Sequence, residues 1–176
     1  MNTRLAVSAV AAGLVIVAGT VPLATADRGG RHVNDVREAT AAYHSLDAAM
    51  DDGYTVEVAD AAGLTCIEDP AGGMGVHYLN PELLNAEIDE LRPELMVYAP
   101  EPDGDLRLGA VEYLVLADAW HEAQGKQPPQ LFGKKFNLVP VGNRYGLPPF
   151  YALHLWLWES NPVGLLQDWN PDVDCP

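Results

Sequence analysis

Two histidines and one glutamate stand within the most apolar stretches of this chain. His77 follows a glycine-rich run, Glu112 lies inside the segment 106–116, and His154 lies inside the segment 150–158. Imidazole nitrogens and carboxylate oxygens are ligands that Zn, Cu and Fe ions accept in proteins. The sequence therefore predicts a metal site made of His77, Glu112 and His154, with Zn, Cu and Fe as the candidate ions.

Alternation along the strand predicted at 150–158 places His154 on an aromatic side that includes two tryptophans, whereas leucines occupy the opposite side. In the segment 106–116 the same alternation places Glu112 on the side of the aliphatic residues Leu108, Ala110 and Leu114. A carboxylate that is buried there needs a partner, because burial of an unpaired charge is costly. We therefore expect a polar and aromatic pocket on the sheet. The residues expected to contact a ligand in this pocket are Tyr113, Trp156 and Trp158.

The three polar residues come from separate predicted strands, and no local motif such as HExxH supports them. Three interpretations therefore stay open: a metal site, a metal-free His–Glu arrangement that orients a ligand or exchanges protons, and a structural polar network. The function that we favour is an exported domain that binds a small ligand or a metal ion. The alternatives are a secreted enzyme, using a His–Glu acid/base pair or a metal centre of two histidines and one carboxylate, and a structural or envelope-interaction protein.

The elements that must position these residues are one helix and several strands. Apolar residues spaced by three and four positions predict a helix over residues 35–50. A turn at 100–105, rich in proline, aspartate and glycine, predicts an antiparallel hairpin between its flanking strands. A short second helix is expected at 117–125 and an irregular, proline-rich stretch at 127–149. The predicted strands are 54–58, 75–80, 95–99, 106–116 and 150–158.

This order of elements predicts an α+β fold. We expect the N-terminal helix to pack on one face of a mostly antiparallel, strongly curved sheet with long proline-rich loops. The opposite face, which carries the histidines, then needs a different cover or lines a pocket.

The composition limits the class of protein. The 176 residues include 10 Lys plus Arg and 25 Asp plus Glu, which gives a formal net charge of −15, and 48% of the residues are hydrophobic. The apolar content is too high for a disordered chain. Nucleic-acid binding is excluded, because a chain this acidic repels a phosphate backbone. A small molecule or a metal ion remains as the expected partner, and the oligomeric state is left open.

The first 26 residues have the layout of a secretory signal peptide. One arginine precedes an uncharged segment over residues 5–23, and the small residues Ala24 and Ala26 precede the first acidic residue. We expect export by the general secretion route, followed by cleavage of this segment and no stable membrane insertion. The mature protein is then secreted or stays in the periplasm or cell envelope. The alternative is that the segment is retained as a membrane anchor. Residues 27–34 are expected to form a flexible linker and residues 35–176 a single globular domain.

The chain contains two cysteines, Cys66 and Cys175, and both follow the predicted signal peptide. An even number of cysteines in an exported protein favours a disulfide. We therefore predict a Cys66–Cys175 bond. A thiolate metal site is the weaker alternative, since neither cysteine has another cysteine or a histidine at ligand spacing.

Several motifs resemble those of a family of small exported bacterial proteins of uncharacterised function. They occur in order along nearly the whole mature chain: GGMGVHY at 72–78, VEYL at 111–114, YALHLWLW at 151–158, and a C-terminal NP…DWNP…C pattern. The resemblance implies export and a mature chain that folds as one unit. It implies no activity, cofactor or partner.

Overall fold

The computed structural model describes residues 26–176, so the predicted signal peptide lies outside the described residues except for Ala26. The helical elements are α1 (Ala26–Thr40), η1 (Ala41–His44), α2 (Leu46–Asp51), η2 (Pro81–Leu83) and α3 (Ala117–Gln124). The strands are β1 (Val56–Glu57), β2 (Cys66–Asp69), β3 (Gly72–Leu79), β4 (Leu95–Pro100), β5 (Leu106–Leu116), β6 (Gln130–Leu131), β7 (Lys134–Lys135), β8 (Asn137–Val139) and β9 (Phe150–Trp156).

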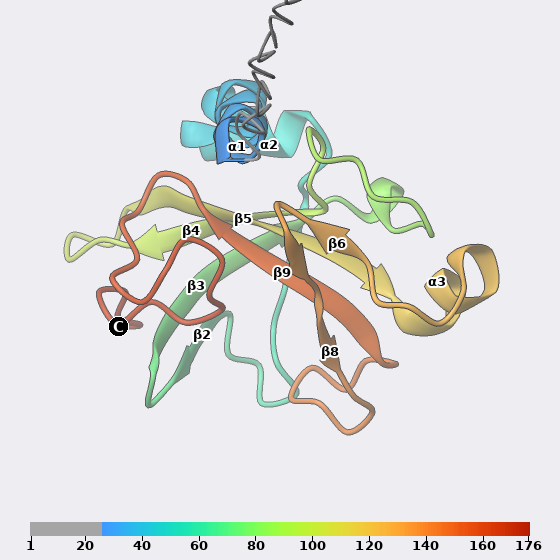
Figure 1. Ribbon diagram of the computed structural model, residues 1–176. Coiled ribbons are helices and arrows are strands. Elements are labelled where there is room, and N and C mark those ends of the chain that lie inside the picture. The colour runs from blue at the N-terminus through green and yellow to red at the C-terminus, as the bar shows by residue number, and fades with distance from the viewer. Residues whose placement is uncertain (1–25) are drawn as a thin grey trace, which may run out of the picture.

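One seven-stranded sheet forms the centre of the fold (Figure 1). Its strand order is β1-β3-β4-β5-β9-β8, with β2 paired beside β1 on the same edge of β3, and every pair is antiparallel. The predicted hairpin is confirmed, since β4 and β5 pair on either side of the turn at 101–105. Within the stretch expected to be irregular, β8 adds an edge strand to β9.

The helix expected over residues 35–50 is interrupted. Helix α1 ends at Thr40, and α2 begins after Ser45, whose backbone is extended and whose Oγ accepts a hydrogen bond from the amide of Ala48 at 3.3 Å. Serine favours this capping position because its side chain satisfies a free amide of the first helical turn. In addition, α1 begins at Ala26 and so includes residues 27–34, which we expected to form a linker.

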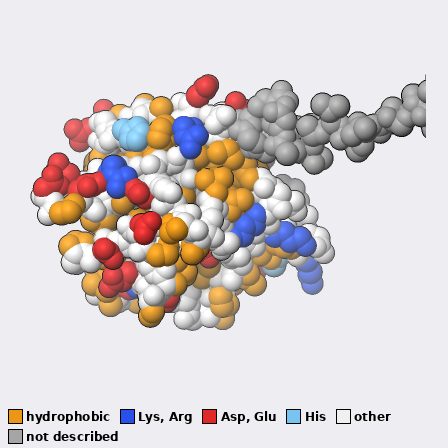
Figure 2. All heavy atoms as spheres, turned by 60° about the vertical axis from the view of Figure 1, so that its left-hand side comes forward, with side chains coloured by type: hydrophobic (Ala, Val, Ile, Leu, Met, Phe, Trp, Pro, Cys, Tyr) orange, Lys and Arg blue, Asp and Glu red, His pale blue; other side chains and the backbone are white. Residues whose placement is uncertain are grey.

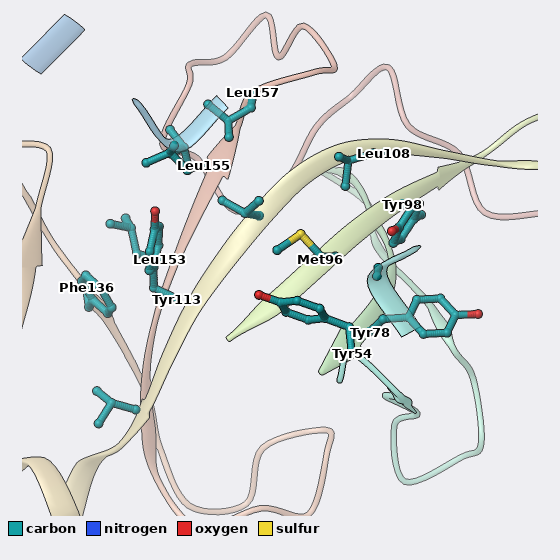
Figure 3. Close-up of a cluster of buried hydrophobic side chains, with 14 of the residues drawn as sticks. Tyr54, Tyr78, Met96, Tyr98, Leu108, Tyr113, Phe136, Leu153, Leu155 and Leu157 are labelled. Carbon is teal, nitrogen blue, oxygen red and sulfur yellow. The ribbon is translucent and has the colours of Figure 1, made fainter. Parts of the chain in front are cut away.

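The two faces of the sheet are covered by different parts of the chain. Helices α1 and α2 lie over one face, which we call the helix face (Figure 1). The predicted alternation is confirmed for residues 150–157, because Tyr151, Leu153, Leu155 and Leu157 join the core on the helix face. It fails at Trp158, which we expected on the side of His154 but which also packs against the helix-face core. Figure 3 shows part of this core, in which strand side chains from β3, β4, β5 and β9 gather on one side of the sheet.

The opposite face, which we call the tail face, is covered by the C-terminal residues 161–176 and by the loop between β8 and β9. Val173 packs there with Trp156 of β9, and Trp156 donates a hydrogen bond from Nε1 to the carbonyl oxygen of Gln167 at 2.7 Å. Gly73 forms an isolated bridge with Asn170, and a Cβ at Gly73 would lie 2.5 Å from the carbonyl oxygen of Val173. The glycine at position 73 is therefore required for the close approach of the tail to β3.

The α+β fold with a helix on a mostly antiparallel sheet is confirmed. The strong curvature that we expected is not confirmed, because no sheet is strongly curled. Figure 2 shows acidic side chains spread over one face of the molecule, with basic ones between them. Among the described residues, no helix is long and apolar enough to span a bilayer.

The predicted disulfide is confirmed: Cys66 on β2 is bonded to Cys175 near the end of the chain, 109 positions away. The bond fixes the end of the tail beside β2 and β3. It therefore also constrains the cover of the tail face.

Replacement of both cysteines by alanine is expected to lower the free energy of unfolding by about 2–5 kcal/mol, because the unfolded chain is then no longer constrained by a long covalent loop. Chemical denaturation of the oxidised protein and the variant measures this difference. Reduced wild-type protein serves as the control and should match the variant. Equal stability of the oxidised protein and the variant would contradict the prediction.

Candidate metal centre

Strand register brings the three predicted residues together on the tail face. Glu112 of β5 is paired directly with His154 of β9, and on its other side with Leu95 of β4. His77 of β3 is paired with Val97 of β4, which belongs to the adjacent row of the same face. The imidazole of His77 therefore approaches Glu112 diagonally across β4.

The expected alternation of β5 holds for Glu112 but not for the whole strand. The pairing with β4 shifts by one residue at Gly109, because Val97 faces Ala110 while Tyr98 faces Leu108. This irregularity turns Leu108 into the core of the helix face, although we expected it beside Glu112. Ala110 and Leu114 stay on the tail face with Glu112, so the predicted position of the carboxylate is retained.

Three ligand atoms converge in this region. The Nε2 atoms of His77 and His154 are 3.2 Å apart, and Nε2 of His77 is 3.5 Å from Oε2 of Glu112. The other carboxylate oxygen, Oε1, is 3.5 Å from Nδ1 of His154. One ligand atom from each of the three residues lies within 4.8 Å of the other two. The group is therefore close enough to bind a metal ion.

The spacing of the ligand atoms around His77 and the orientation of its ring also suit a metal ion. Ligand atoms bound at 2.0–2.1 Å around a tetrahedral Zn²⁺ lie about 3.3 Å apart, which is close to the distances from Nε2 of His77. Nδ1 of His77 is 3.2 Å from the carbonyl oxygen of Gly75. Because a carbonyl only accepts hydrogen bonds, Nδ1 carries the proton, and the lone pair of Nε2 points to the group. A backbone carbonyl on the second ring nitrogen is the usual support of a metal-binding histidine.

All three side chains are nearly excluded from solvent, with exposed fractions of 3% for His77, 7% for Glu112 and 1% for His154. Burial lowers the pKa of His77 to about 4 and lowers the pKa of His154 well below its usual value, where the neighbouring His77 adds to the effect. Burial, with the charge of Asp168 adding to it, raises the pKa of Glu112 to about 8. Without a cation, the group is therefore uncharged at neutral pH.

Two cavities meet at Glu112. An apolar cavity of about 210 Å³ has His77 and Glu112 as its buried polar residues, and a second cavity of about 340 Å³ contains Glu112 together with Asn137, Arg144 and Asp168. We call them the apolar cavity and the polar cavity. His154 lines neither cavity, so it forms the closed side of the group.

The structure places the three aromatic residues expected to contact a ligand outside both cavities. Tyr113 lies in the core of the helix face beside Phe136 and Leu153 (Figure 3), with its hydroxyl bonded to the carbonyl oxygen of Glu90. Trp156 stacks near His154, but its indole holds the tail. Trp158 follows the end of β9 and packs against Arg37 of α1.

Other residues occupy the positions next to the group. Tyr145 and Phe150 line both cavities, and their ring centroids are 6.1 Å apart. Alternation along β9 already places Phe150 on the side of His154, whereas Tyr145 lies in an irregular loop that carries no pattern. The buried Glu94, whose pKa burial raises to about 7, was also missed. Glu94 directly precedes β4, and its Oε2 accepts a hydrogen bond from the amide of Leu114 on β5.

In the metal-free protein, the free energy of unfolding is expected to fall as the pH rises from about 4.5 to 8, and replacement of Glu112 by glutamine is expected to abolish this part of the fall. Because the folded protein keeps a proton on Glu112 up to about pH 8 while the unfolded chain releases it near pH 4.5, wild-type stability from this group falls as the pH rises through that window. The stability of Glu112→Gln relative to wild type should therefore increase between about pH 4.5 and 8. Urea denaturation in the presence of a chelator measures this.

The matched control for this measurement is Glu57→Gln, which removes an exposed carboxylate on β1. A pH dependence of relative stability that is the same in both variants would contradict the assignment of the effect to buried Glu112.

Comparison of the chain with protein-family models, with curated proteins and with solved structures finds no match. The resemblance to a family of small exported bacterial proteins therefore stays a prediction from the sequence motifs. What the site does must be inferred from its own geometry.

Proposed function

We propose that this protein is an exported metal-binding protein that holds a Zn²⁺ ion between His77, Glu112 and His154. The observation that carries the proposal is the convergence of three ligand atoms from three strands, each within 4.8 Å of the others, in a nearly solvent-free site. The hydrogen bond from His77 to Gly75 supports it, because this bond leaves the correct nitrogen free to bind.

The composition of the group favours zinc over copper, whereas iron(II) also accepts two histidines and one carboxylate. The group has two imidazoles and one carboxylate and, among residues 26–176, no sulfur ligand belongs to it, whereas copper sites commonly include one. Three protein ligands leave a fourth zinc position free, which is the arrangement of catalytic rather than structural zinc sites. A zinc ion held in this way would act as a Lewis acid toward a molecule bound in that position.

Two observations support export. The Cys66–Cys175 disulfide fits an oxidising compartment outside the cytosol, and the N-terminal sequence has the layout of a signal peptide. An exported protein acquires its metal after translocation. A site made of neutral imidazoles and a buried carboxylate, without thiols that oxidise, suits that environment.

Tag-free protein incubated with zinc and then dialysed is expected to contain about one Zn²⁺ per chain, measured by elemental mass spectrometry. The variants His77→Ala, Glu112→Gln and His154→Ala should each retain less than about one tenth of that amount, because each lacks one of only three ligands. The control is His44→Ala, which removes an exposed histidine of η1 and should keep full zinc content. Parallel loading with Fe²⁺ and Cu²⁺ identifies the preferred ion.

Circular dichroism of each variant separates a lost ligand from a lost fold. Wild-type protein without zinc, or folded His154→Ala protein with full zinc content, would contradict the proposal. Preferential retention of iron or copper would overturn the choice of zinc.

A metal-free proton relay is the second candidate function, and one specific observation favours it. The 3.2 Å separation of the two Nε2 atoms is a hydrogen-bond distance, so one imidazole can donate to the other without an ion. With Nδ1 of His77 protonated, the donor is His154, whose Nδ1 then faces the protonated carboxyl of Glu112. A series of hydrogen-bonded groups of this kind could transfer protons in an enzyme that uses a His–Glu acid/base pair. Nitrogen NMR of the imidazoles in chelated protein would identify these tautomers.

A further inference from the structure

The buried polar groups that line the apolar cavity lie together at one end of it. Its lining consists largely of aliphatic and aromatic side chains, and the polar groups of His77 and Glu112 are nearly inaccessible to solvent. Leu84 and Leu147 also line it, yet 37% and 41% of their surfaces are exposed. The cavity therefore leads from an apolar mouth, at these two leucines, to a polar inner end.

The side of the mouth at Leu147 belongs to a loop that neighbouring segments hold in place. The loop between β8 and β9 lies beside the segment after β1 (Figure 1), since the amide of Ala61 donates to the carbonyl oxygen of Arg144 at 2.8 Å. Arg144 also donates to Asp60 at 3.0 Å and to the carbonyl oxygen of Glu68 at 2.8 Å. These contacts fix the segment that carries Tyr145 and Leu147, so the cavity is largely formed in advance of binding.

The size of the cavity limits its occupant. At about 210 Å³ it exceeds the cavity of about 150 Å³ that binds benzene in an engineered protein. It is smaller than the 300–1,000 Å³ typical of pockets for drug-sized molecules. A molecule somewhat larger than benzene fits, such as a benzene ring with a short substituent.

The charges around the cavity exclude an anion as the preferred occupant. Among the described residues that line it, none is a lysine or arginine, and the whole chain carries a formal net charge of −15. A carboxylate ligand would lose its hydration without gaining a cationic partner from the residues that line the apolar cavity. A neutral molecule has no such cost.

The inner end favours a ligand that carries an oxygen. The two contacts of Glu112 with the histidines are 3.5 Å long, which is beyond the range of ordinary strong hydrogen bonds, so its carboxyl group retains capacity to bond a ligand. We propose that the apolar cavity is a binding site for a small neutral molecule, apolar over most of its surface, whose single carbonyl or hydroxyl oxygen reaches the carboxyl group of Glu112. This inference concerns the metal-free protein and goes beyond metal binding, because the cavity is lined by side chains of this chain alone.

Acetophenone is a suitable probe, since it combines a benzene ring with one carbonyl group. Saturation-transfer NMR and calorimetric titration on chelated full-length protein should detect its binding to the wild type. Leu147→Trp, which fills the mouth, should weaken binding by at least about tenfold. Leu138→Trp is the matched control, because Leu138 is also exposed, on β8, but lines neither cavity, and binding should be unchanged.

Two further probes of similar size test the chemistry of the occupant. Benzoate should bind more weakly than acetophenone because it is charged, and α-methylstyrene should bind more weakly because it lacks the oxygen. Absence of acetophenone binding, or equal binding to Leu147→Trp, would overturn the site. Preferred binding of benzoate or α-methylstyrene would overturn the chemical class. Chelated protein is used throughout, so a failure of zinc binding does not affect these outcomes.

Discussion

The arrangement of the tail face follows from one constraint: a carboxylate and two imidazoles are held in two adjacent rows of one sheet face, away from water. Removal of these groups from water opposes their charged forms, which is why burial raises the pKa of Glu112 and lowers the pKa of both histidines. A buried group of this kind is stable only if its members share protons or bind a cation. Both solutions require the three side chains to stay close together, and the strand register supplies this.

The cover of the tail face explains why the group is buried but not fully packed. The C-terminal tail covers the side near Trp156, where Gly73 allows close approach and the disulfide fixes the end of the chain. The other side is covered by the loop that contains Tyr145, which has no regular structure. Unlike the helix face, where α1 and α2 lie over a continuous core, the tail face has two separate apolar clusters, with cavities beside Glu112.

The sequence predicted those parts of the site that depend on the alternation of side chains. The positions of His154 and Phe150 on one side of β9, and of the leucines on the other, follow directly from a period of two. For β5 the same argument placed Glu112 correctly, yet it misplaced Leu108, because a register shift at Gly109 reverses the alternation. A shift of this kind depends on pairing with β4, which is a tertiary contact that no local pattern of β5 encodes.

The residues that the sequence did not reveal share a different cause. Tyr145 and Asp168 reach Glu112 from segments without regular structure, so their positions depend on loop contacts such as those of Arg144 and Asn137. Tyr113, by contrast, lies in a regular strand, and the error was to place it in the pocket. It follows Glu112 directly, and adjacent strand residues face opposite sides of a sheet. The helix expected at 35–50 was interrupted because Ser45 caps a new helix, although the apolar spacing continues across it.

The two interpretations of the buried group, a proton relay and a metal site, differ in the net charge of the group. In the proton relay, Glu112 stays protonated and the group is neutral, so its apolar surroundings cost little. In the metal site, Glu112 releases its proton and a divalent cation with two neutral histidines and one carboxylate carries a net positive charge. The neighbouring Asp168 then changes its effect: beside a neutral group it raises the pKa of Glu112, whereas beside a cation it offsets the excess charge. The strongly acidic chain favours the second state, because every nearby carboxylate that opposes ionisation of Glu112 stabilises a bound cation.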